Sequence, residues 1–295
     1  MNPPGPTPYL RPLRRPDGSV QLGLGARAVR LLGLTDAELR WLTGLDPTRA
    51  LTEALSTAAL EGIDPARATG ILDRLVTGDV LHPTTTEPPQ VAVVGSGALP
   101  ALLVDSLRQS DRVLTSRVRP GGEDAGPTDL AVVVSAAPPA PESVRPWLAA
   151  RVPVLPVWCL PEQASIGPLL LPEHGPCLHC LDLTRAEVDP GWPWLSAQLT
   201  RAGITGPESV DALPAVRLLA AGLTTTLVLD HVDGRLTSRE WSFEVATPGP
   251  TLERHLWPTH PGCSQCARPP LQAVPTPTDE GGSSPGTGGT DTMVG

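Results

Sequence analysis

The chain has 295 residues, of which 40% are hydrophobic and 18% are charged, and its formal net charge is −9. This length is sufficient for about two domains, and the hydrophobic content excludes an intrinsically disordered chain. The net charge argues against a nucleic-acid-binding protein, because such a protein needs clustered positive charge. All 22 basic residues are Arg, so there is no lysine for a P-loop, a Schiff base or pyridoxal attachment.

No part of the sequence predicts a membrane partner. Residues 1–8 lack the basic and apolar blocks of a signal peptide, and we expect a flexible N-terminus there. The longest apolar stretch, 212–229, contains Arg217 and a run of Thr, so we expect a buried helix rather than a membrane span. The expectation is a soluble, cytoplasmic protein.

Residues 9–83 have the pattern of a small domain in which strands precede helices. The spacing of Thr35 and Glu38 is typical of a capping box and predicts a helix start. Asp-Pro pairs at 46–47 and 64–65 predict two more helices, each followed by a glycine. The strands are expected at 9–15, 20–24 and 28–32. This order predicts a winged-helix-like domain.

A linker is expected at 84–89, which reads Thr-Thr-Thr-Glu-Pro-Pro, and an α/β domain at 90–266. Apolar runs that alternate with a helix at 99–108 are typical of a parallel sheet buried on both faces, and they predict a Rossmann-like domain. The runs are 91–94, 129–134 and 152–160. The tail, 267–295, is rich in Gly, Pro, Ser and Thr, so we expect it to be disordered.

Four of the five cysteines form two Cys-x-x-Cys pairs, Cys177 with Cys180 and Cys263 with Cys266. Two such pairs suit a closed tetrahedral zinc site, which is structural because it leaves no position for water or substrate. Two disulfides, or one redox pair beside a coincidental one, are the alternatives. Two matched pairs with a spare thiol fit a cytosolic zinc protein better. The spare thiol, Cys159, ends an apolar run and is expected to be buried and inert.

A turn with Gly95 and Gly97 follows the first buried strand. A dinucleotide-binding turn reads G-x-G-x-x-G, with an acidic residue about 20 positions later. Here Pro100 occupies the third glycine position, and 114–119 contain no carboxylate. A helix N-terminus still attracts phosphate. We therefore interpret Gly95 and Gly97 as a vestigial nucleotide turn, and we expect ATP binding to be lost.

These motifs together resemble the ThiF family. The resemblance is carried by 91–104 with the Gly-x-Gly turn, by 129–134 and by 166–183, which contains the first cysteine pair. The ThiF family contains adenylyltransferases that activate sulfur carriers and ubiquitin-like proteins. The resemblance implies that the helix at 212–229 and the second cysteine pair complete a domain with structural zinc.

A divergent, mostly actinobacterial branch of this family is the closer match. The run from Cys180 to Arg185, followed by Asp189-Pro-Gly-Trp-Pro-Trp-Leu, resembles cyclodehydratase-type, leader-peptide-binding proteins. Those proteins come from gene clusters for azole-modified natural products, including bacteriocins. Residues 9–83 resemble, by element order, the PqqD-like element that binds a leader peptide. The resemblance spans 9–266 in all.

The chain departs from active ThiF-family enzymes at the adenylation site. Those enzymes hold ATP phosphates with Arg and Lys and place magnesium with an Asp at the end of the fourth strand. Here Ser135 and six Ala or Pro residues follow Val134, and no Lys is present. The segment after Cys180 also lacks an acceptor cysteine. The adenylation site therefore looks dismantled.

The sequence favours a non-catalytic ThiF-like protein that presents a leader peptide to a separate YcaO-type cyclodehydratase. We expect the leader to pair with the third strand, near Val29 and Leu31, and to place apolar side chains beside Leu72 and Leu75. Alternatively this strand is covered by the α/β domain. The alternative functions are an active adenylyltransferase of the ThiF/MoeB type and a winged-helix DNA-binding regulator. A homodimer is compatible with the resemblance.

Overall fold

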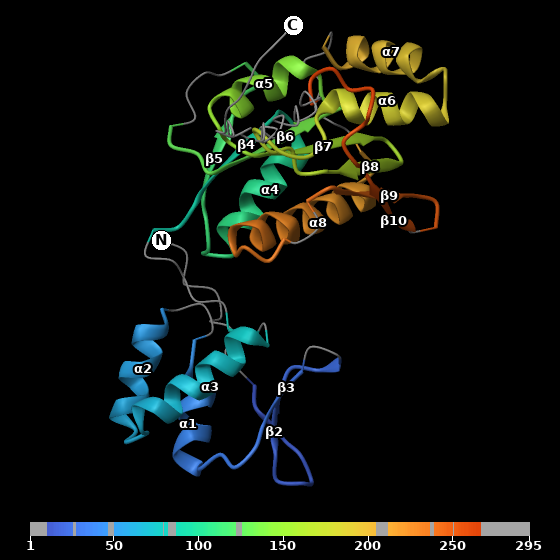
Figure 1. The fold of residues 1–295 in the computed structure, drawn as a ribbon. Helices are drawn as coiled ribbons and strands as arrows, with labels where there is room; N and C mark the ends of the chain where they lie inside the picture. The colour runs from blue at the N-terminus through green and yellow to red at the C-terminus, as the bar shows by residue number, and fades with distance from the viewer. Residues whose placement is uncertain are drawn as a thin grey trace, which may run out of the picture.

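The computed structural model describes residues 11–25, 28–46, 50–78, 80–81, 87–121, 126–204, 212–236, 239–249 and 251–266. The predicted N-terminal segment at 1–8, the tail at 267–295 and the first half of the linker, 84–86, lie outside these residues. The described part contains two sheets, each with helices packed against it (Figure 1).

The N-terminal unit has a three-stranded antiparallel sheet in the order β1-β2-β3, followed by three helices. This order agrees with the one expected from the sequence. The winged-helix likeness itself stays a prediction, because many small domains share the order. The strands are β1 (Leu13–Arg14), β2 (Val20–Leu22) and β3 (Val29–Leu31). The helices are α1 (Asp36–Gly44), α2 (Leu51–Leu60) and α3 (Pro65–Thr77).

The predicted capping signals form as expected. The Thr35 hydroxyl accepts from the Glu38 backbone N–H, and the Glu38 carboxylate accepts from the Thr35 N–H at 2.7 Å, which completes the capping box of α1. The carboxylate of Asp64 accepts from the N–H of Arg67 and caps α3. The helix expected from Pro47 begins at Leu51 instead, and 47–49 lie outside the described residues.

The larger unit is a seven-stranded mixed sheet in the order β10-β9-β8-β7-β6-β4-β5. Strands β5, β4, β6 and β7 are parallel, and β8, β9 and β10 extend the sheet antiparallel. The strands are β4 (Gln90–Val94), β5 (Leu114–Val118), β6 (Leu130–Ser135), β7 (Val154–Leu160), β8 (Gln163–Ile166), β9 (Trp241–Ala246) and β10 (Thr251–Leu256).

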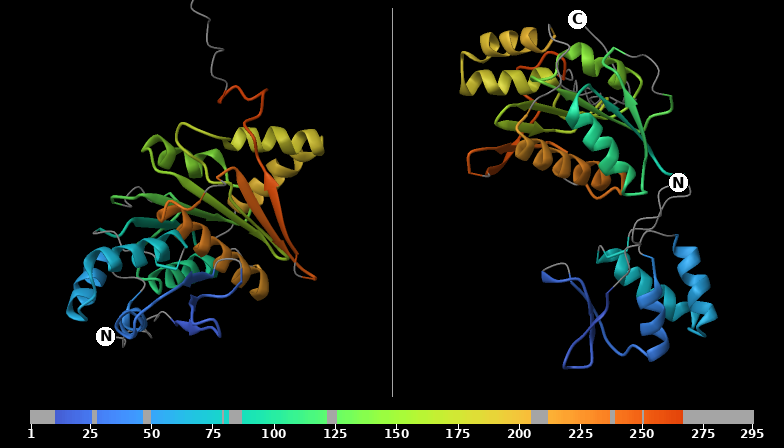
Figure 2. Two further views of the ribbon diagram at one scale, coloured as in Figure 1. Left: turned by 60° about the horizontal axis from the view of Figure 1, so that its bottom comes forward. Right: turned by 180° about the vertical axis from the view of Figure 1, so that it is seen from behind.

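Helices cover both faces of this sheet (Figure 2). One face is covered by α4 (Ala98–Arg108) and α8 (Pro214–Val232) and the other by α5 (Pro141–Ala149), α6 (Leu178–Val188) and α7 (Trp192–Ile204). The strands β4 and β6 are almost fully buried, as their apolar runs predict. The Rossmann-like α/β prediction is therefore confirmed at the level of architecture.

Helix α8 corresponds to the apolar stretch that the sequence analysis assigned to a buried helix. Among the described helices, it alone is long and apolar enough to cross a membrane. It packs on the sheet through six buried side chains, which explains its composition. They are Val216, Ala220, Ala221, Thr224, Leu227 and Val228.

Candidate functional site

The two cysteine pairs meet at one point beside the sheet. Cys177 is the N-cap residue of α6, and Cys180 lies in the first turn of that helix. Cys263 and Cys266 lie in the turn region that follows β10. All four Sγ atoms lie within 4.8 Å of one another. The fold therefore brings together segments that are 86 residues apart.

The spacing of the sulfur atoms fits a tetrahedral metal ion. The Sγ–Sγ distances are 3.9 Å for Cys177–Cys180, 3.6 Å for Cys177–Cys263 and 3.6 Å for Cys180–Cys266. Zinc–sulfur bonds of about 2.3 Å in a tetrahedron place sulfurs roughly 3.8 Å apart. All four cysteines are free thiols at distances far above the ~2.05 Å of a disulfide. The cluster could hold a metal ion, as expected for zinc.

The environment of the cluster favours ionisation of Cys263 and opposes that of Cys177 and Cys266. Burial opposes ionisation of Cys263, but hydrogen bonds from the Cys266 N–H, the Cys180 thiol and the Gln265 N–H lower its pKa to about 7. Burial, together with the neighbouring Cys177 and Cys180, raises the pKa of Cys266. A bound cation would remove this conflict, because metal ligation requires thiolates.

An arginine between two tryptophans joins the cysteine cluster to the helices. The guanidinium of Arg185 on α6 lies 4.8 Å from the ring centroid of Trp192 and 4.7 Å from that of Trp257. The indole N–H of Trp257 donates to the Ser242 hydroxyl at 2.7 Å in the interior. No local sequence pattern predicts this cluster, because Trp257 lies far from Arg185 and Trp192 in the chain.

The fifth cysteine is separate from the cluster. Cys159 lies in β7 within the core, and its side chain is 2% exposed. Burial raises its pKa to about 12. These properties agree with the expected inert thiol, because reactivity requires an accessible thiolate.

The turn between β4 and α4 is tightly filled. Gly95 has φ +148°, and a Cβ atom at this position would lie 2.9 Å from Cγ of Pro100 and 3.0 Å from the Val134 carbonyl oxygen. Pro100 itself is buried. The side chain of Arg117 donates to the Gly97 carbonyl oxygen at 3.1 Å. The side chains of Pro100 and Arg117 therefore pack directly against the glycine turn.

A small cavity lies between the loop after β6, β7 and α6. The hydroxyl of Ser135, at the end of β6, donates to the Ala137 carbonyl oxygen at 2.6 Å. The adjacent cavity measures about 10 Å³, which is room for about one water molecule. Its lining comprises Pro138, Pro139, Pro156, Trp158, Gly167, Leu178, Leu181, Asp182 and Arg185.

The residues predicted to contact a peptide lie in the core of the N-terminal unit. Leu31, Leu72 and Leu75 are each at most 2% exposed, and Val29 is partly buried against the same core. They line no open groove in this structure. Contact of a leader side chain with Leu72 or Leu75 would require this core to open. Main-chain pairing with Val29 and Leu31 would use the edge of β3, and it stays a prediction.

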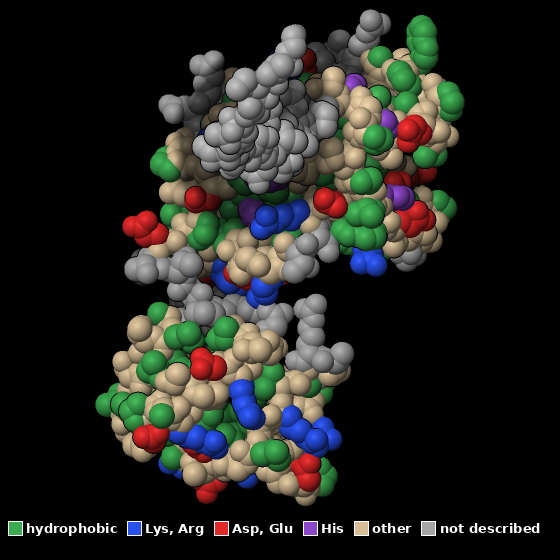
Figure 3. All heavy atoms as spheres, viewed as in Figure 1, with side chains coloured by type: hydrophobic (Ala, Val, Ile, Leu, Met, Phe, Trp, Pro, Cys, Tyr) green, Lys and Arg blue, Asp and Glu red, His purple; other side chains and the backbone are tan. Residues whose placement is uncertain are grey.

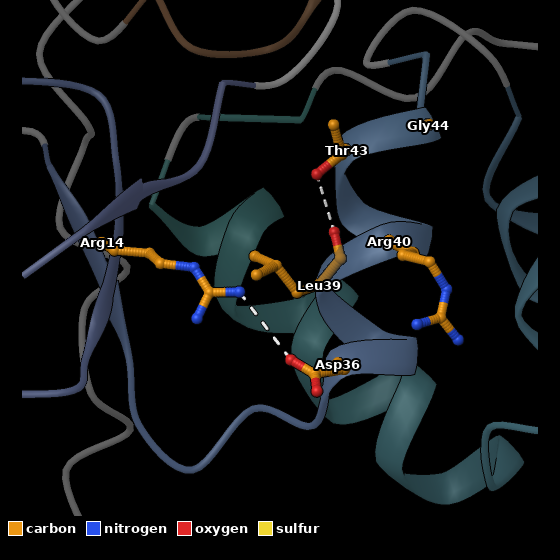
Figure 4. Close-up of a pocket in the computed structure, with 6 residues that line it drawn as sticks. All are labelled: Arg14, Asp36, Leu39, Arg40, Thr43 and Gly44. Atoms are coloured by element: carbon orange, nitrogen blue, oxygen red, sulfur yellow. Dashed lines mark hydrogen bonds and ion pairs between the residues drawn. The ribbon is translucent and has the colours of Figure 1, made fainter.

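A cavity that the sequence analysis did not predict lies between β1 and α1 (Figure 4). It has a volume of about 550 Å³ and is widely open to solvent. Arg14 reaches from β1 toward Asp36 and Leu39, whereas Arg40 points to the other side of α1. The lining comprises Arg14, Asp36, Leu39, Arg40, Thr43 and Gly44.

Comparison of the sequence with protein families finds no matching family, and comparison with curated proteins finds no match. Among solved structures, the chain is similar to the heterocyclase TruD, with 17% identity and a TM-score of 0.54. It is also similar to a heterocyclase in complex with substrate and cofactor, with 16% identity and a TM-score of 0.54. The E. coli microcin synthetase McbBCD complex matches with 16% identity and a TM-score of 0.44.

These matches concern the fold. The alignments cover 88% of this chain but only 42% of TruD and 38% of the second heterocyclase. The McbBCD alignment covers 87% of this chain and 98% of the matched chain. The chain thus spans less than half the length of the two heterocyclases. The TruD match supports the ThiF-like α/β fold that the motifs predict.

Proposed function

We propose that this chain is a non-catalytic ThiF-like component in the biosynthesis of an azole-modified peptide. In this proposal it binds the leader of a ribosomally made precursor and presents the precursor to a separate YcaO-type cyclodehydratase, which supplies the ATP-dependent chemistry. The N-terminal unit, residues 9–83, captures the leader. The α/β unit, residues 90–266, is the scaffold that meets the modifying enzyme.

The heterocyclase fold motivates the link to peptide modification. The similarity to TruD extends over 88% of this chain, so it includes parts of both units. Because the chain spans 42% of TruD, the proposal assigns the remaining chemistry to a partner protein.

The tightly packed turn between β4 and α4 supports the non-catalytic part of the proposal. Pro100 packs beside Gly95, and the guanidinium of Arg117 donates a hydrogen bond to the carbonyl oxygen of Gly97. A phosphate group bound at a helix N-terminus needs close approach to free backbone N–H groups. Proline at position 100 lacks such a group. These observations favour a structural turn over an ATP site.

The four-cysteine cluster is assigned a structural role. Zinc held by Cys177, Cys180, Cys263 and Cys266 would join α6 to the segment after β10. Four thiolates complete a tetrahedron and leave no position for a reacting group. Free thiols fit a cytoplasmic location, where disulfides are rare. The cluster would stabilise the presenting scaffold without taking part in the chemistry.

Two measurements on the full chain test this proposal. We expect no ATP-dependent pyrophosphate exchange with the precursor encoded beside its gene, and no ATP-induced rise in melting temperature. If ATP bound only the folded chain, ATP at 100 times its dissociation constant would raise the free energy of unfolding by about 2.7 kcal/mol. We also expect the precursor to bind, and its YcaO-type enzyme to modify it faster when this chain is present. Pyrophosphate exchange would instead establish the adenylyltransferase alternative, and failure to bind the precursor would refute the proposal.

A further inference from the structure

Helix α8 has a second apolar face that the fold leaves exposed. Its inward side chains pack on the sheet, yet only 33% of its apolar 18-residue window is buried. Leu218 is 61% exposed and Leu219 is 44% exposed, and Gly222 has open space at its Cβ position. Among the described residues, the hydrophobic core that contains α8 includes none from the N-terminal unit. The outward face of α8 is therefore available to a partner.

The outward residues form one stripe along α8 that carries no charge. Residues three or four positions apart lie on the same side of a helix. The members of the stripe, each at least partly exposed, are Ala215, Leu218, Leu219, Gly222, Thr225, Thr226 and Leu229. The hydroxyl of Thr226 donates to the Gly222 carbonyl oxygen at 3.0 Å, so this polar group is already satisfied within the helix. Charged residues are depleted at the cores of protein interfaces, and the stripe shares this property.

Two leucines of β10 widen this apolar surface. Leu252 pairs with Val245 in the antiparallel ladder, so both side chains project to the same face of the sheet. Val245 packs in the core that includes α8, and Leu256 lies on the same face because it follows Leu252 by four residues. The two leucines are 62% and 50% exposed. Figure 3 shows hydrophobic side chains at the surface in the region where Figure 1 draws α8, β9 and β10.

The size of this surface approaches what a stable dimer needs. With 19 residues, α8 is about 28 Å long and about 10 Å across. The strands beside it add roughly 10 Å of width, because neighbouring strands lie about 4.8 Å apart. The footprint is then on the order of 500–600 Å² in projection, and the relief of the side chains increases its accessible area. A stable interface buries about 800 Å² on each partner.

The order of large and small residues along the stripe is self-complementary about Gly222. A two-fold axis through this residue places α8 antiparallel to its copy, so that residues at equal distances before and after Gly222 meet. The resulting pairs are Leu218 with Thr226, Leu219 with Thr225, and Ala215 with Leu229. Each pair joins a larger side chain to a smaller one. A small residue at the centre lets the two axes approach to the 8–10 Å of packed helices.

We infer that the outward face of α8, together with Leu252 and Leu256 of β10, is the interface of a symmetric homodimer of this chain. The two copies of α8 cross antiparallel at Gly222. The opposite face of the sheet, with α5, α6, α7 and the four-cysteine cluster, stays free in each copy. This inference does not depend on the proposed leader-binding function.

The test is the oligomeric state of the full chain, measured by sedimentation velocity over a series of protein concentrations. Gly222→Phe puts an aromatic ring on the two-fold axis, and Leu218→Glu puts a carboxylate on the stripe. Both positions are exposed within one chain, so circular dichroism should show that both variants fold. Each variant should raise the dissociation constant of the dimer at least tenfold, because a symmetric interface contains every substitution twice.

Leu60→Glu is the matched control, because Leu60 is an 88% exposed leucine on α2 of the N-terminal unit. It should change the dissociation constant less than twofold. Gly222→Cys gives a second readout. Axes about 10 Å apart bring the two Cα atoms at the crossing to roughly 5 Å, which a disulfide can span. A mild oxidant should therefore cross-link this variant into a covalent dimer, and wild type, with its five native cysteines, should remain uncross-linked.

Several outcomes would overturn the inference. A monomeric wild type would do so, and a monomer that floats with phosphatidylcholine vesicles would assign the face to a membrane surface. A dimer that persists in Gly222→Phe and Leu218→Glu would place the contact elsewhere on the chain, and a dimer lost only in Leu60→Glu would place it on α2. A dimeric wild type that fails to bind the precursor would refute the proposed function and leave the dimer standing, so the two failures are distinguishable.

Discussion

Sγ of Cys180 lies 3.6 Å from Sγ of Cys266, although 86 residues separate them in the chain. Cys180 is fully buried at the start of α6, and Cys266 lies in the turn region after β10. Four thiols at this distance are unfavourable neighbours without a cation, because each thiolate that forms repels the next. A metal ion would convert this repulsion into a cross-link between the two segments.

Cys180→Ser is expected to abolish stoichiometric zinc binding and to destabilise the α/β unit. Structural zinc contributes on the order of 10–16 kcal/mol in small sites at neutral pH. Wild type should contain about one zinc per chain by elemental analysis, and the variant should contain far less and melt earlier. Cys159→Ser is the control and should retain the metal, since Cys159 lies in β7. Metal-free wild type with unchanged stability would contradict the assignment.

Arg185→Ala is expected to destabilise the α/β unit by roughly 2 kcal/mol, because it removes two desolvated cation–π contacts. Arg185 lies between Trp192 and Trp257, and its side chain is 17% exposed. Chemical denaturation followed by tryptophan fluorescence measures the change. The control is Arg151→Ala: Arg151 is 76% exposed in an ion pair with Glu173, so the change should stay within about 0.5 kcal/mol. Equal effects would contradict a structural role for the sandwich.

Glu38→Gln is expected to destabilise the N-terminal unit by about 1–2 kcal/mol at pH 7. The carboxylate is 5% exposed and accepts from Nε of Arg67 at 2.7 Å. Burial opposes its ionisation, but hydrogen bonds from Arg67 and Thr35 hold the pKa of Glu38 below its usual value of 4.5. The amide oxygen of glutamine can still accept from the Thr35 N–H, but its NH2 group cannot accept from Arg67, so the variant loses the charge and the hydrogen bond to Arg67.

The pH dependence of this effect has a defined sign. Because the folded-state pKa of Glu38 is lowered, its stabilisation is fully present above the unfolded-state pKa and is lost as the pH falls through the folded-state value. The difference between wild type and Glu38→Gln should therefore shrink below about pH 4.5. Asp73→Asn, an exposed change on α3, serves as the control at pH 7. A difference that grows on acidification would contradict the ion pair.

Local signals allowed much of the fold to be predicted. The capping box at Thr35 and the Asp64-Pro65 start of α3 each depend on residues within one helical turn. The buried strands β4 and β6 are continuous apolar runs, which few other elements resemble. The proximity of the two cysteine pairs could be predicted, because two Cys-x-x-Cys pairs are the typical spacing of a four-cysteine metal site.

Long-range features were less predictable. Strands β8 and β9 could not be predicted from local patterns. Gln163–Ile166 is too short to show a periodic pattern, and Trp241–Ala246 pairs with it only because the chain returns to the sheet after α8. The burial of Leu72 and Leu75 followed from helix packing, so an expected groove is a core in the structure. The cavity beside Leu39 depends on β1 being an edge strand, which no local pattern reveals.

Gly95→Ala is expected to destabilise the α/β unit by more than 1 kcal/mol, because the substitution is strained in two ways. The φ of +148° disfavours any side chain, and the added Cβ would lie 2.9 Å from Pro100 Cγ and 3.0 Å from the Val134 carbonyl. Gly222→Ala is a sharp control, since Gly222 lies within α8 with open space around its Cβ position. Alanine there should be neutral or stabilise by up to about 1 kcal/mol. Thermal denaturation of both variants measures the contrast, and a Gly95→Ala protein as stable as wild type would show that Pro100 can move aside and would contradict the tight packing of this turn.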